Sequence, residues 1–217
     1  AIEIIHQGGV IIYPTDSGYA IGCCIGNKKS MERIEKIRGL EKHHNFTLMC
    51  RDLSELASYA RVDNSLFRVI KNNTPGPYTF IFKGTKEVPK RLLNDKKKTI
   101  GIRVPQCEIT LALLEELGEP LMSCSLILPG QEHTESDPEE IRFKLEKHVD
   151  LIIHGGFLSE HPTSVIDFSE DTVNIIREGS GDVSVFDCLK ISEGRKKGWF
   201  SENGVVFCKD SPTFLGI

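Results

Sequence analysis

The chain has 217 residues, of which 39% are hydrophobic and 27% charged, and its formal net charge is -4. That length allows one domain with a sizeable core. The acidic balance excludes the whole chain as an electrostatic nucleic-acid binder, so a nucleic-acid contact must use a local basic patch. No apolar run reaches the roughly 18–20 residues of a membrane helix, and we expect no membrane association.

Seven cysteines form no C-x-x-C pair and lie at positions 23, 24, 50, 107, 124, 188 and 208. This spacing argues against structural zinc, and we expect no metal held by protein ligands alone. Several lie within apolar runs, which is typical of buried free thiols in a reducing compartment, so we expect a cytoplasmic protein. Because the chain begins with Ala1 and not with methionine, we expect that a leader or the start of the first helix is missing.

In chain order, residues 8–22 predict a buried strand that runs into a polar turn after Pro14. Asn27 and Gly39 predict the two ends of a helix over 28–38. Further helices are expected over 53–60, 65–71, 109–117 and 138–148, the last behind a Ser136–Glu139 capping box. Further strands are expected over 48–50, 78–82, 100–104, 121–128, 151–154, 164–167 and 173–177.

The strands outnumber those of a simple βαβ alternation, so the predicted fold is α/β, with a twisted mixed sheet and packed helices. After Gly181 the sequence loses any clear period. Residues 186–217 are therefore expected to form a C-terminal extension, or a partly ordered strand pair, of unknown role.

Polar side chains at the end of the first strand, in the segment 15–19, form either a ligand-binding turn or an ordinary turn in which Asp16 bonds its own backbone. Arg38 could bind phosphate or stabilise the negative end of its helix. His43-His44 has no third ligand at metal spacing, which favours surface imidazoles. Neither a Walker loop nor a G-x-G-x-x-G motif is present, so a nucleotide would use another kind of site.

The densest basic region contains five lysines that could contact RNA or a polyphosphate, at Lys83, Lys86, Lys96, Lys97 and Lys98. A solvated loop is the alternative for such a run. The segment Ser123-Cys124-Ser125 could bind phosphate or an amino acid, and without a G-x-S-x-G elbow it is not expected to supply a serine nucleophile.

Taken in order, six segments resemble the YrdC-like family, namely PTDSGY, TPGPYTFIF, GIRVP, SCS, PTSVIDF and IIREGSG. The segments NFTLMCRDLSEL, GTKEVP and ESDPEEI resemble its YciO branch closely. The resemblance covers about residues 1–185. It implies a large, concave, positively lined cavity and binding of double-stranded RNA or tRNA. It also implies synthesis of threonylcarbamoyl-adenylate from threonine, bicarbonate and ATP, with release of pyrophosphate.

The resemblance further implies a role for each matched residue. Threonine's polar groups would be held by Thr15 and Arg103, with Thr163 and Ser164 beside the substrate. The nucleotide would be lined by Arg38, Thr79, Ser123, Ser125 and Arg177. No cofactor would be tightly bound, and Mg²⁺ would enter with ATP or AMP by bridging phosphates.

The chain departs from the synthase pattern at two positions. Leu40 replaces the second cation of the K-x-R-P motif, and Ile127 replaces the asparagine of S-x-S-A-N. Each lost charged hydrogen bond would cost about 1.5–3 kcal/mol, which is ample to abolish efficient ATP turnover. Three functions remain open: hydrolysis or removal of a threonylcarbamoyl group from an adenylate or tRNA, residual synthesis, and RNA binding without catalysis.

Overall fold

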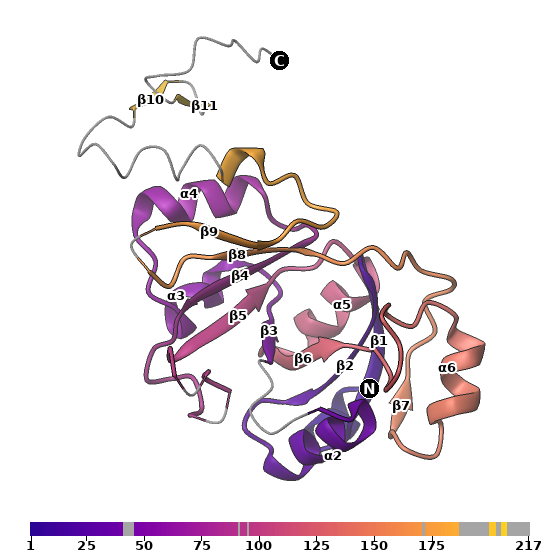
Figure 1. Ribbon diagram of the computed structural model, residues 1–217. Coiled ribbons are helices and arrows are strands. Elements are labelled where there is room, and N and C mark those ends of the chain that lie inside the picture. Colours follow the sequence, from indigo (N-terminus) through magenta and orange to yellow (C-terminus); the bar gives the residue numbers. More distant parts are fainter. Residues whose placement is uncertain are drawn as a thin grey trace.

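The computed structural model describes residues 1–40, 46–90, 92–94, 96–170, 172–186, 200–202 and 205–207. Nine strands form one sheet in the order β7-β1-β2-β6-β3-β5-β4-β8-β9 (Figure 1). The pairs β1/β7, β3/β5 and β4/β8 are parallel, and the other neighbouring pairs are antiparallel. The mixed α/β sheet that the sequence predicts is therefore confirmed.

The strands of the sheet are β1 Ile11–Thr15, β2 Gly18–Cys24, β3 Thr47–Met49, β4 Tyr78–Lys83, β5 Thr99–Arg103, β6 Leu121–Ser125, β7 Leu151–Ile152, β8 Ser164–Asp167 and β9 Asn174–Arg177. The helices are α1 Ile2–His6, α2 Lys28–Arg38, the 3-10 helix η1 Leu53–Glu55, α3 Leu56–Tyr59, α4 Asn64–Asn72, α5 Glu108–Leu117 and α6 Pro138–Leu145. A separate antiparallel pair joins β10 Phe200–Glu202 to β11 Val205–Phe207.

Helix α2 has the ends that its sequence predicts. The Asn27 side chain accepts a hydrogen bond from the backbone N–H of Ser30 at 3.2 Å. Gly39 takes a left-handed conformation with φ 61°, which ends the helix at little steric cost.

Other elements differ from the prediction for local physical reasons. Residues 8–22 form a hairpin of β1 and β2, because Gly18 adopts φ 96° and the chain turns back. Strand β6 ends at Ser125, because the N–H of Ile127 turns back to the carbonyl of Ser125 at 3.0 Å. The predicted helix over 53–60 begins as the 3-10 helix η1 and continues as α3. The short helix α1 lies where the remainder of a first helix was expected, but its bounds were not predicted.

The predicted capping box before α6 is wrong. The side chain of Asp137, not that of Ser136, accepts the hydrogen bond from the N–H of Glu139, at 2.9 Å. The hydroxyl of Ser136 instead donates to Glu160 Oε1 at 2.9 Å. Ser136 thus ties the start of α6 to the connection between β7 and β8.

The two faces of the sheet have different coverings. The first face carries the alternate strand residues Ile12, Ile21, Leu48, Phe80 and Ile102, which pack in one core with residues of α2, α3, α4 and α6. The second face carries a smaller apolar core over β1, β2 and β6, which α1 and α5 cover. Elsewhere the second face carries Thr47 of β3, Thr79 of β4 and Gly101 of β5 beside one another.

Among the described cysteines, Cys23, Cys24, Cys50, Cys107 and Cys124 are free thiols, and three of them are buried. Cys188 and Cys208 lie outside the described residues. In the described part of the chain, no helix combines the length and apolar character needed to cross a membrane.

Candidate functional site

The polar part of the second face brings together residues from distant parts of the chain. Thr47, Gly101 and Thr79 share it, since a methyl group on Gly101 would lie 3.0 Å from Thr47 Oγ1 and 3.4 Å from Thr79 Cγ2. Thr15 and Arg103 reach the same place from the ends of β1 and β5. These strand ends form the candidate site, and the large concave cavity implied by the resemblance stays a prediction.

The turn of the β1–β2 hairpin is held by its own hydrogen bonds. Thr15 Oγ1 donates to the carbonyl of Gly18 at 2.6 Å and accepts from the N–H of Ser17 at 3.2 Å. A side chain at Gly18 would meet Thr134, whose Cγ2 would lie 2.7 Å from the added Cβ. The turn is therefore fixed both from within and by the neighbouring loop.

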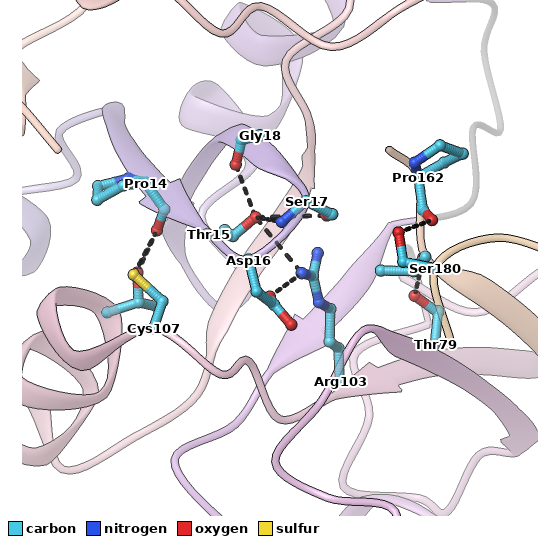
Figure 2. A network of polar contacts seen from close by, with 12 residues as sticks. Pro14, Thr15, Asp16, Ser17, Gly18, Thr79, Arg103, Cys107, Pro162 and Ser180 are labelled. Carbon is cyan, nitrogen blue, oxygen red and sulfur yellow. Dashed lines mark hydrogen bonds and ion pairs between the residues drawn. The ribbon is translucent and has the colours of Figure 1, made fainter. Parts of the chain in front are cut away.

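Arg103 and Asp16 form a buried ion pair at the centre of the site. Arg103 Nη2 bonds Asp16 Oδ1 and donates to Thr15 Oγ1 at 3.4 Å. The two side chains of the ion pair are 6% and 12% exposed. Figure 2 shows Arg103 between the hairpin turn and the two neighbouring segments that contain Pro162 and Ser180. The structure thus brings together Thr15 and Arg103, both predicted to hold threonine.

Asp16 was not among the predicted site residues. The sequence did contain a signal, because a buried arginine needs an anionic partner. Asp16 is a carboxylate in the same motif as Thr15. An aspartate in a turn more often bonds its own backbone, and this competing interpretation hid its role.

A second polar group lies beside the ion pair. The hydroxyls of Thr79 and Thr163 are 3.0 Å apart and share a hydrogen bond. Arg177 donates from Nε to the carbonyl of Thr163 at 2.9 Å and from Nη2 to its hydroxyl at 3.0 Å. The three predicted residues Thr79, Thr163 and Arg177 therefore form one hydrogen-bonded group.

The guanidinium groups of Arg103 and Arg177 lie close enough for the charge of one to affect the other. Partial burial, and then the positive charge of Arg103, lower the pKa of Arg177. Among the described residues no carboxylate forms an ion pair with Arg177. An anion placed between the two arginines would relieve their repulsion, which suits a carboxylate or a phosphate.

One predicted residue is turned away from this group, and a second is buried on the same face as the group, where it pairs with Thr47. Ser164 is fully buried on the first face, where its hydroxyl donates to the carbonyl of Gly181 at 2.6 Å and accepts from the N–H of Gly179 at 2.9 Å. Ser123 is 1% exposed, and its hydroxyl accepts a hydrogen bond from Tyr13 at 2.6 Å. Because Ser123 accepts this bond, its own hydroxyl hydrogen remains available as a donor.

Arg38 binds the main chain at the end of β6. Its Nε donates to the carbonyl of Ile127 at 2.6 Å, and its Nη1 donates to the carbonyl of Ser125. The structure therefore brings Arg38 to the predicted residue Ser125, whose side chain is exposed. Leu40, which replaces the second cation, packs against the core of the first face.

The predicted RNA-binding lysines are all exposed, but acids neutralise two of them. Lys83 lies 4.0 Å from Glu170, and Lys97 lies 3.7 Å from the buried Asp167. His43-His44 lies outside the described residues. Within the described part of the chain, no group of three or more His, Cys, Asp or Glu side chains is arranged as metal ligands.

The sheet order and this polar site define a YrdC-like domain. The sequence profile of the Sua5/YciO/YrdC family, described as "Telomere recombination", matches residues 3–179, and the chain belongs to this family. The chain is 66% identical over 186 residues to the Escherichia coli (strain K12) protein YciO, itself described as uncharacterized, covering 86% of this chain and 90% of that protein. The crystal structure of E. coli YciO matches with a TM-score of 0.81 over 85% of this chain and 90% of that chain.

More distant relatives connect the fold to a named activity. The threonylcarbamoyl-AMP synthase of Vibrio vulnificus (strain YJ016) is 26% identical over 182 residues, which cover 82% of this chain and 96% of the synthase. P. abyssi Sua5, crystallised with L-threonine, shares the fold at 22% identity with a TM-score of 0.75, over 82% of this chain and 52% of that chain. The chain is thus a YrdC-like domain related to threonylcarbamoyl-AMP synthase.

Proposed function

We propose that this protein removes a threonylcarbamoyl group, from an adenylate or from modified tRNA, and does not make one from ATP. The observation that supports the proposal is a contrast between two parts of the site. One part, the threonine end, contains the residues predicted to hold threonine, and the other, the nucleotide end, contains Arg38 and Ser125. Thr15, Arg103 and Thr163 are held in place at the threonine end by hydrogen bonds. At the nucleotide end, two donors of Arg38 are taken up by backbone carbonyls.

The threonine end offers hydrogen-bond partners that match the polar groups of a threonylcarbamoyl group. A threonylcarbamoyl group carries a carboxylate, a hydroxyl and an N–H beside its carbonyl. The guanidinium groups of Arg103 and Arg177 suit the carboxylate, and the hydroxyls of Thr79 and Thr163 suit the threonine hydroxyl. Holding these groups in fixed positions orients the carbonyl toward an attacking water. The water would displace AMP or the adenine nitrogen of tRNA and leave N-carboxythreonine, which breaks down to threonine and carbon dioxide.

Synthesis from ATP fits this arrangement less well. A triphosphate bound by Arg38 would first have to replace the carbonyls of Ser125 and Ile127 as its hydrogen-bond partners. Each charged hydrogen bond given up costs about 1.5–3 kcal/mol. Mg²⁺ would have to be held by phosphates, because the described residues offer no group of protein ligands.

The test is incubation of the purified protein with threonylcarbamoyl-adenylate and, separately, with tRNA carrying the threonylcarbamoyl modification. We expect mass spectrometry to show loss of the group from at least one substrate. Arg177→Met should reduce the rate at least tenfold, and Lys90→Met, at an exposed lysine outside the site, is the matched control. Unchanged substrates in both incubations would rule out removal. Pyrophosphate release that depends on both threonine and ATP would favour residual synthesis instead.

We propose in addition that double-stranded RNA or tRNA contacts the connection between β4 and β5. The supporting observation is that Lys86, Lys96 and Lys98 are exposed there and form no ion pair within the described residues. A gel-shift titration at two salt concentrations tests this, because phosphate contacts weaken as salt rises. The variant with all three lysines changed to glutamine should bind more weakly and show a smaller salt dependence. Absence of binding at low salt would remove this function.

A further inference from the structure

Helix α6 and the edge strand β7 lie side by side at one end of the sheet (Figure 1), and two exposed phenylalanines belong to this region. Phe143 of α6 is 89% exposed, and Phe157, in the connection that follows β7, is 79% exposed. This connection is tied to the start of α6, because the N–H of Leu158 donates to the carbonyl of Ser136 at 3.1 Å. A single exposed phenylalanine needs no explanation, but two around one helix favour an interaction surface.

A groove of about 370 Å³ opens between α6 and β7. Its apolar lining comes from Pro138, Val149, Leu151 and Ile152. Because β7 is the last strand of the sheet, no strand of the described residues pairs with its outer side. A groove beside an open sheet edge is a surface along which an extended chain can lie.

Carboxylates predominate around this groove. Glu139, Glu146 and Asp150 line it, together with the guanidinium of Arg142 and with His154. Glu139 lies 3.7 Å from His154, which is charged only when protonated, and Glu146 lies 3.5 Å from Arg142. The side chains of Glu139 and Glu146 are 71% and 51% exposed. Such exposed pairs contribute little to stability, so the cations of a partner can replace them.

The chain around the groove is acidic as a whole. Residues 131–161 contain eight Asp and Glu and three Lys and Arg, which gives this segment a formal charge of -5, whereas the complete chain has -4. A nucleic acid would be repelled from this region, and a second copy of the chain would bring like charges together. The charge therefore favours a basic partner.

We propose that the groove between α6 and β7, flanked by Phe143 and Phe157, binds a basic, extended segment of another protein. An apolar side chain of that segment enters the groove, and its lysines or arginines face the three carboxylates. The two phenylalanines exclude water from the contact, as aromatic side chains do at the centre of many interfaces. The groove shares no residue with the candidate site, so the proposal is independent of the removal of a threonylcarbamoyl group.

Three heptapeptides test the proposal in a fluorescence anisotropy titration of the purified protein. The first is Lys-Val-Lys-Phe-Lys-Val-Lys, the second has serine at the three apolar positions, and the third has glutamate at the lysine positions. We expect the first peptide to bind at least about tenfold more tightly than either of the others, because the contact needs both charge and an apolar anchor. Equal binding of the first and second peptides, or no binding of the first at low salt, would overturn the proposal.

Substitutions at exposed positions localise the contact without disturbing the core. Phe143→Ala combined with Phe157→Ala should weaken binding of the first peptide at least about fivefold. Glu139→Lys should have an effect of similar size, whereas Glu116→Lys, the same charge change at an exposed glutamate of α5, should change binding less than about twofold. Equal losses for Glu139→Lys and Glu116→Lys would mean that the peptide responds only to net charge, and the groove would be rejected.

Two further measurements distinguish the other possible occupants. In nitrogen-15 NMR spectra, the amide signals of Leu151 and Ile152 should shift when the first peptide is added, and shifts confined to the hairpin turn at Thr15 would contradict the proposal. Sedimentation of the protein alone should show a monomer. A dimer that Phe143→Ala dissociates would mean that a second copy covers this face, and the proposed partner would be wrong.

Discussion

The phenol of Tyr13 donates a 2.6 Å hydrogen bond to the hydroxyl of Ser123, although β2 lies between their strands in the sheet. Gly22 makes this contact possible, because it pairs directly with Ser123 and leaves the space that Tyr13 crosses. A side-chain carbon on Gly22 would lie 3.2 Å from Tyr13 Cε1. Burial raises the pKa of Tyr13, so the phenol remains a donor at neutral pH.

This relationship predicts a strong coupling between two substitutions. Tyr13→Phe should leave the buried Ser123 hydroxyl unpaired, and Ser123→Ala should leave the phenol unpaired. Each should reduce the free energy of unfolding by about 1–3 kcal/mol. The double variant should lose clearly less than the sum, because it removes both polar groups together. Urea unfolding of all four proteins gives the coupling, and simple additivity would show that the bond contributes nothing.

Two glycines of the sheet should respond differently to alanine. On Gly22 the new carbon would lie 2.6 Å from the carbonyl of Met122, which is backbone and cannot easily move. Gly22→Ala should therefore destabilise the fold by at least about 1 kcal/mol. On Gly101 the new carbon would meet Thr47 Oγ1 at 3.0 Å, within the candidate site. Gly101→Ala should keep most of the stability and lose affinity for L-threonine.

Thermal unfolding and titration calorimetry on the same two variants check this contrast. A Gly101→Ala protein that binds threonine as tightly as the wild type would place the ligand elsewhere. A Gly22→Ala protein as stable as the wild type would mean that β2 and β6 can separate locally without cost.

The phenol of Tyr19 anchors the connection between β7 and β8. It donates to the carbonyl of Gly156 and accepts from the N–H of Gly155, both at 2.9 Å. Tyr19→Phe would remove both bonds inside the protein, and we expect a loss of about 1–3 kcal/mol in the free energy of unfolding. Because this connection leads to Thr163, affinity for L-threonine should also fall. Tyr59→Phe, at a half-buried tyrosine outside the site, is the control and should leave affinity unchanged.

Local signals predicted the helices better than the faces of the sheet. Asn27 and Gly39 act within one turn of α2, so the sequence alone defined its ends. Which face a strand residue occupies depends on register, and register is set by pairing with distant strands. For that reason Ser164, predicted beside the substrate, lies on the first face, whereas Ser123 pairs with Thr47 and lies on the face of the site.

In the candidate site, too, the sequence identified residues better than it identified their partners. The resemblance placed Thr15 and Arg103 together, and the structure joins them by a hydrogen bond. It placed Thr163 beside the substrate and Arg177 at the nucleotide, whereas the structure joins these two residues to each other. It did not predict that Arg38 binds two carbonyls, because motif letters identify a cation and not its partner. The ion pair of Asp16 also depends on which oxygen faces Arg103, and only coordinates contain that information.

Buried thiols predict how stability changes at alkaline pH. Burial, with smaller effects of Cys24 and Cys124, raises the pKa of Cys23 to about 12 in the folded protein, whereas the ordinary value is 9.0. Between these values the unfolded chain binds fewer protons than the folded one, so the free energy of unfolding must fall as pH rises above about 9. One such thiol contributes a slope of about 1.4 kcal/mol per pH unit.

Urea unfolding at pH 7.5, 9.5 and 10.5 should show this decline. Cys23→Ala should have a shallower slope than the wild type, and an unchanged slope would mean that the thiol ionises in the folded state.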